Sequence, residues 1–86
     1  MEPVYEIVLH AHAERELDKV PDAEFPRIDK QISALAQNPR PFGSKKLGGH
    51  LHRVRVKDWR VVYGVIDKEK RVVILRVVRR NEHTYK

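Results

Sequence analysis

The 86-residue sequence predicts an α+β fold, in which an N-terminal strand and a two-helix hairpin pack on an antiparallel sheet of about four strands. Three observations predict it. Apolar residues recur at helical spacing between residues 11 and 35, short β-branched segments lie at both ends of the chain, and Pro and Gly gather between residues 39 and 49. A chain of this length has room for one modest core, so we expect residues 1–86 to form one domain.

The first half of the chain predicts a strand and two helices. Residues 4–9, VYEIVL, are rich in β-branched and aromatic types, which is typical of a strand. A short helix is predicted from Ala11 to Val20, and its apolar stripe consists of Ala13, Leu17 and Val20. Asp22 is the predicted N-cap of a second helix, whose apolar stripe consists of Phe25, Ile28, Ile32 and Leu35.

The second half predicts a loop followed by three antiparallel strands. Residues 39–49, PRPFGSKKLGG, have the proline and glycine content of a loop. In the next segment, LHRVRVK, period-two alternation places Arg53, Arg55 and Lys57 on one face of a strand. Residues 59–66 and 71–78 predict two more strands, joined by a short polar connection that suits a hairpin.

Charge is distributed unevenly along the chain, whose formal net charge is +6. Residues 1–39 hold four basic and eight acidic side chains, whereas residues 40–86 hold fourteen basic and four acidic ones. The second half therefore predicts a polyanionic partner, with nucleic acid first, an acidic protein second and a membrane surface third.

Arginines of the three C-terminal strands recur on one predicted face. Arg53 and Arg55 alternate with valines, Arg60 begins the next strand, and Arg76 and Arg80 share a face of the last one. A half-buried strand needs a polar outer face, so each of these residues taken alone could be a solvated charge. Like charges repel at such spacing, however, and clustered guanidinium groups bind phosphate oxygens in bidentate fashion.

A resemblance to a known family covers essentially the whole chain and is most specific in residues 38–85, NPRPFGSKKLGGHLHRVRVKDWRVVYGVIDKEKRVVILRVVRRNEHTY. This segment resembles the C-terminal half of RelE-type toxins, which belong to the RelE/ParE superfamily of type II toxin-antitoxin systems. The residues that carry the resemblance are Leu47, Arg53, Arg55, Arg60, Tyr63, Arg80 and Tyr85. The sequence departs from the family pattern at His52, where an aromatic residue is common, at Lys57, where glycine is frequent, and at Trp59, where tyrosine is usual.

The resemblance implies a ribosome-dependent, metal-independent endoribonuclease, an mRNA interferase that cuts messenger RNA in the A site and stops translation. It implies attack of the RNA 2′-hydroxyl on the 3′-phosphate, with catalytic roles for Arg53, Arg55, Arg60, Arg80 and Tyr85. The further residues expected to bind RNA or the ribosome are Lys45, Lys46, Lys57, Arg76 and Arg79. For the pair Lys45 and Lys46, a solvated loop is an equally good interpretation.

The partners that the resemblance implies are the ribosome, mRNA and a cognate antitoxin, and the basic surface suggests that an acidic segment of the antitoxin would wrap it. We expect no cofactor, and no metal site, because the histidines lack carboxylate partners at ligand spacing. The absence of cysteine suits a reducing cytoplasm, and no apolar run approaches the length of a membrane span. Two alternatives remain open: a ParE-like inhibitor of DNA gyrase without nuclease activity, and a non-toxic RNA- or partner-binding module of the same fold.

Overall fold

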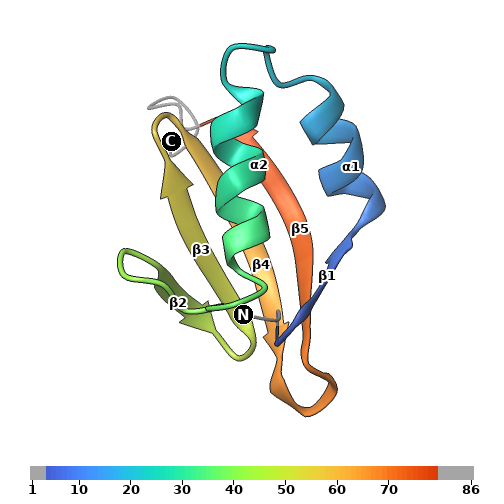
Figure 1. The fold of residues 1–86 in the computed structure, drawn as a ribbon, viewed down its shortest axis with the longest axis vertical. Helices are drawn as coiled ribbons and strands as arrows, with labels where there is room; N and C mark the ends of the chain where they lie inside the picture. Colours follow the sequence, from blue (N-terminus) through green and yellow to red (C-terminus); the bar gives the residue numbers. More distant parts are fainter. Residues whose placement is uncertain (1–3, 80–86) are drawn as a thin grey trace.

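A five-stranded sheet with the order β1-β5-β4-β3-β2 forms the centre of the fold (Figure 1). The computed structural model describes residues 4–79. The elements along the chain are β1 (Glu6–Leu9), α1 (Ala11–Asp18), α2 (Phe25–Ala34), β2 (Lys45–Gly48), β3 (Leu51–Val56), β4 (Trp59–Ile66), the 3₁₀ turn η1 (Asp67–Glu69) and β5 (Arg71–Arg79). The α+β class and the predicted order of one strand, two helices and a three-stranded meander are therefore confirmed.

The sheet differs from the prediction in the direction of one strand. β1 pairs with β5 in parallel, so the sheet is mixed, whereas β2 to β5 run antiparallel to their neighbours. A parallel pair needs a long connection between its strands, and the chain between β1 and β5 provides it. No turn joins β1 directly to another strand, so the local sequence contains no signal for its direction.

The sheet also has one strand more than predicted, because β2 lies inside the segment expected to be a loop. Lys45 pairs with Arg53 and Lys46 with His52, before the chain turns through Gly48 and Gly49. Gly49 has a φ of 54°, in the left-handed region that glycine enters without steric cost. β2 is a short polar edge strand, so it shows none of the apolar alternation by which a strand is recognised.

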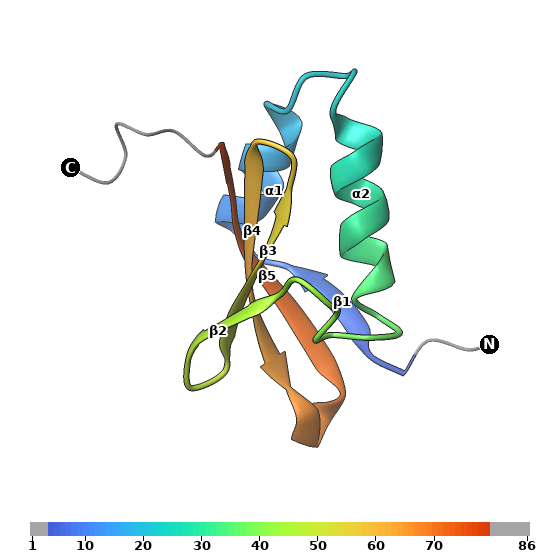
Figure 2. The same cartoon turned by 90° about the vertical axis from the view of Figure 1, so that its left-hand side faces the viewer.

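One face of the sheet packs against α2, which lies on that side only, while α1 lies beside β5 (Figures 1 and 2). The core between them is made of Ala13, Val20, Ile28, Ile32, Leu35, Val54, Trp59, Val61, Tyr63, Val65, Val72, Ile74 and Val77. In the predicted helical stripes, Ala13, Val20, Ile28, Ile32 and Leu35 are buried, although α1 ends at Asp18, before Val20, and Leu17 is only partly buried against the core. Phe25 is 38% exposed and does not join the core.

The predicted N-cap of the second helix is wrong. α2 begins at Phe25 with Glu24 as its N-cap, and Asp22 lies in the turn before it. The Glu24 side chain does not cap the helix; its carboxylate accepts a hydrogen bond from the indole N–H of Trp59. Glu24 thereby links the start of α2 to the start of β4.

Candidate nucleic-acid interface

The face of the sheet opposite α2, which we call the open face, carries two rows of side chains. In the first row, Lys45 of β2 lies opposite Arg53 of β3, and Val62 of β4 connects Arg53 to Arg76 of β5. In the second row, Arg55 of β3 lies opposite Arg60 of β4, followed by Val78 of β5. The Cβ atoms of directly opposed residues are about 5 Å apart, so each row holds its cations within reach of one phosphate or its neighbour.

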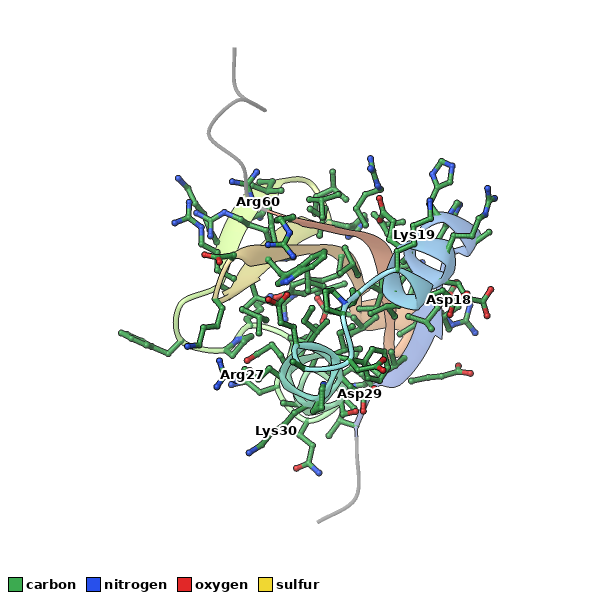
Figure 3. All side chains as sticks on the ribbon, turned by 90° about the horizontal axis from the view of Figure 1, so that it is seen from above. Asp18, Lys19, Arg27, Asp29, Lys30 and Arg60 are labelled. Carbon is green, nitrogen blue, oxygen red and sulfur yellow. The ribbon has the colours of Figure 1, made fainter. Side chains whose placement is uncertain are left out.

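Figure 3 places Arg60 on the other side of the sheet from the α2 residues Arg27, Asp29 and Lys30. The four strands β2 to β5 contain no Asp or Glu at all. None of the carboxylates of residues 4–79 forms an ion pair with Arg53. The open face is therefore a dense group of cations without acidic residues in its own strands, which favours a bound polyanion.

Arg76 is held at the border of the open face by α1. Its Nε and one terminal nitrogen donate to Glu16 Oε2 at 3.0 and 2.8 Å, and Glu16 Oε1 accepts from the backbone N–H of Val77 at 2.7 Å. Burial would raise the pKa of Glu16, but the hydrogen bonds from Arg76 and Val77 outweigh it, so this pKa is lowered. Sequence reasoning missed Glu16, since it is one of several exposed-looking acids on a polar helix face.

The remaining predicted binding residues lie away from the open face. Lys46 shares the opposite side of β2 and β3 with His52. Lys57 lies in the turn between β3 and β4, with a φ of 57°. The guanidinium of Arg79 lies 4.8 Å from the ring centre of Trp59, on the α2 side of the sheet, and 3.5 Å from a carboxylate oxygen of Glu24.

The family of this chain is shown by its similarity to known proteins. Residues 7–84 match the family described as the ParE toxin of the type II toxin-antitoxin system parDE. The chain belongs to the RelE/ParE family of toxins.

Relatives of this RelE/ParE-family chain agree with that assignment. RelE1 of Methanocaldococcus jannaschii, whose name describes a candidate toxin, is 30% identical over 87 residues, covering 95% of this chain and 96% of that protein. A chain of the RelE–RelB complex of Pyrococcus horikoshii OT3 matches this chain with a TM-score of 0.82 and 30% identity, covering 91% of this chain and 97% of that one. The RelBE2 toxin-antitoxin complex of Mycobacterium tuberculosis matches with a TM-score of 0.79 and 26% identity, covering 92% and 100%.

Three departures of this RelE/ParE-family chain from the family pattern can now be placed. Lys57 occupies a left-handed backbone position, which accounts for the frequency of glycine there. Trp59 is 8% exposed and packs in the core. His52 is 5% exposed and stacks on Tyr63, with ring centres 5.7 Å apart and planes at 22°.

Two of the predicted catalytic residues, Arg80 and Tyr85, lie outside the described residues 4–79. Within that range no three His, Asp or Glu side chains come together as metal ligands. Neither described α-helix is long and apolar enough to cross a membrane. The structure therefore brings together Lys45, Arg53, Arg55, Arg60 and Arg76. The roles of Arg80 and Tyr85 remain proposals.

Proposed function

We propose that this chain is the toxin of a type II toxin-antitoxin pair and that it cleaves messenger RNA in the ribosomal A site. The observation that supports the proposal is the open face, where five cations from four strands lie in two adjacent rows. Such a surface suits RNA bound along its phosphate backbone, with the scissile phosphate over the arginines.

The proposed reaction is an internal transfer of the phosphate. The 2′-oxygen forms a bond to the adjacent phosphorus while the bond from phosphorus to the 5′-oxygen breaks. A base receives the proton of the 2′-hydroxyl, and the leaving 5′-oxygen takes up a proton. The products are a 2′,3′-cyclic phosphate and a free 5′-hydroxyl, so neither water nor an oxidant is consumed.

The arginines have the charge that this transition state requires. Arg60, together with Arg80, would neutralise the crowded phosphorane, while Arg53 and Arg55 would orient the RNA backbone on either side. Lys45 and Arg76, at the two ends of the first row, would bind flanking phosphates.

The proton acceptor is the weakest part of this chemistry in the isolated chain. Arginine remains protonated at any usable pH, and His52, the one imidazole of β2 to β5, lies on the α2 side. Tyr85 is the proposed acceptor, although a free phenol titrates near pH 10 and needs arginine neighbours to lower its pKa. Free RNA should therefore be cut slowly. We propose that the ribosome supplies the missing in-line geometry by holding the mRNA.

We also propose a cognate antitoxin as the partner that silences this activity. The related chains of Pyrococcus horikoshii and Mycobacterium tuberculosis are each found in complex with their RelB antitoxins. An acidic segment of such a partner would neutralise the open face and exclude RNA from it.

Primer extension on a reporter mRNA, translated in a purified system, tests the nuclease proposal. Wild-type chain should produce cuts in phase with the reading frame, and Arg80→Ala and Arg60→Gln should each lower cleavage by about 100- to 1,000-fold. Omission of ribosomes should abolish the cuts. Intact mRNA with folded wild-type chain would contradict the proposal.

The alternative is inhibition of DNA gyrase, and the match of residues 7–84 to the ParE toxin family favours it. A gyrase inhibitor would block supercoiling by purified gyrase without cutting RNA. It should depend little on Arg80, whereas the nuclease should depend on it strongly. Supercoiling and primer-extension assays with the same wild-type and Arg80→Ala preparations therefore separate the two functions.

A further inference from the structure

A polar pocket lies away from the open face, beside the hairpin of β2 and β3. It has a volume of about 470 Å³, and it is lined by Arg40, Ser44, Lys46, Gly49, His50, His52, Val65 and Asp67. Lys46 and His52 are cross-strand neighbours, and they point to the α2 side of the sheet because Lys45 and Arg53 occupy the open face.

The acidic residue of this pocket is already bound. Asp67 accepts from a guanidinium nitrogen of Arg40 at 2.7 Å and from the hydroxyl of Tyr5 at 2.5 Å. Lys46 forms no ion pair with any carboxylate in residues 4–79. The pocket therefore has an excess of positive charge and of hydrogen-bond donors.

His52 is the feature that points to a ligand. The residue is 5% exposed, and its ring faces Tyr63 on one side. Within the described part of the chain, neither ring nitrogen has a hydrogen-bond partner. Neither ring nitrogen is among the fully enclosed, unpartnered polar atoms of the described residues, so the imidazole can donate a hydrogen bond to a ligand in the pocket.

We propose that this pocket is a phosphate-binding site, distinct from the open face, in which Lys46, His52 and Arg40 bind one phosphate group. A tetrahedral oxyanion suits donors that converge from a loop and a hairpin, since it accepts hydrogen bonds from several directions at once. The same chemistry fits a backbone phosphate of RNA and a free phosphate. The proposal does not rest on the nuclease activity.

Phosphate titration of the full chain, followed by NMR at the His52 ring and the Lys46 ammonium in a phosphate-free buffer, tests the site. Saturable shift changes at both groups are expected. Lys46→Gln should weaken binding at least about fivefold. Its matched control is Lys45→Gln, which removes the same charge from the next residue on the other face of β2 and should change the affinity less than twofold.

Absence of saturable shifts at His52 would overturn the proposal, and so would equal weakening by the two lysine variants, which would indicate diffuse attraction to a basic hairpin. The spectrum of each variant also reports its folding. A short RNA oligonucleotide distinguishes the two sources of phosphate. If it displaces inorganic phosphate from His52, the site takes a backbone phosphate, and if it does not, the site takes a free one.

Discussion

His52 is a buried imidazole between a tyrosine ring and a basic pocket. Burial lowers its pKa, and the positive charges of Arg40 and Lys46 lower it further. The unfolded chain therefore takes up a proton near the ordinary imidazole pKa of about 6.5, while the folded chain takes it up only at lower pH. The stabilising contribution of neutral His52 is complete above that value and is lost as the pH falls through the folded pKa.

Replacement of His52 by Phe should remove this pH dependence, since Phe keeps the stack on Tyr63 but binds no proton. Urea unfolding between pH 5 and 8 measures it. The slope of the unfolding free energy against pH below 6.5 should flatten in His52→Phe and persist in His12→Gln, an exposed histidine of α1. Equal slopes for wild type and His52→Phe would contradict the conclusion that the lowered pKa of His52 causes the pH dependence.

Lys57 pays a conformational cost at its left-handed φ of 57°. Lys57→Gly should raise the free energy of unfolding by about 1 kcal/mol, because glycine adopts this conformation without a Cβ clash. Thermal or urea unfolding provides the comparison. Asp58→Gly, at the next residue of the same turn, has no positive φ to relieve and should give no gain.

Single residues on regular elements were the most predictable part of the site. Period-two alternation correctly separated Arg53 and Arg55 from Val54. Alternation could not predict that Lys57 lies in a turn or that Arg79 stacks on Trp59, because neither a turn nor a stacking contact follows the period-two pattern of a strand. The roles of Arg80 and Tyr85 come from the family resemblance and remain predictions.

At the scale of elements, α1 protects the part of β5 that β1 does not cover. β1 pairs with Arg71 to Ile74, and beyond that point the register of β5 against β4 shifts. Glu16 accepts the backbone N–H of Val77 there and binds Arg76. An exposed strand edge is a site for unwanted pairing, and a helix with a hydrogen-bonding carboxylate covers it.

Glu16→Ala should therefore lower the free energy of unfolding by roughly 1–3 kcal/mol, because a partly buried N–H loses its acceptor and Arg76 loses its anchor. The matched control is Glu14→Ala, two residues away on the exposed surface of α1, which should cost well under half as much. Urea unfolding of both variants gives the comparison. Similar costs would show that Glu16 is an ordinary surface acid.

Elements with an apolar period were predictable, and those without one were not. The two helices and β3 to β5 follow from their spacing of apolar residues. β2 is polar and pairs on one side only, so its sequence shows no apolar alternation that would predict a strand. The direction of β1 is set by its pairing with the distant strand β5, so the local sequence does not predict it either. Lys45 lies on β2, which was not predicted as a strand, so its position opposite Arg53 could not be predicted.

At the scale of the whole molecule, the open face carries five cations on the side of the sheet opposite α2, the side on which Figure 3 shows Arg60. If its five cations contact phosphates of single-stranded RNA, the logarithm of the affinity should fall with the logarithm of salt concentration with a slope of about −3 to −4. Fluorescence anisotropy with a labelled RNA measures this slope. Arg55→Gln/Arg60→Gln should reduce the magnitude of this slope by about one. An unchanged slope in that variant would show that RNA does not bind at Arg55 and Arg60.

The most direct test of the account is the single-turnover rate of mRNA cleavage on ribosomes with a defined codon in the A site. Arg55→Gln/Arg60→Gln removes two charges from the open face, and Arg27→Gln/Lys30→Gln removes two charges from α2 on the other side. We predict a fall of at least about 1,000-fold for the first pair and less than threefold for the second. Equal rates for the two double variants, or cleavage that survives loss of Arg55 and Arg60, would contradict the central claim that the open face is the active surface.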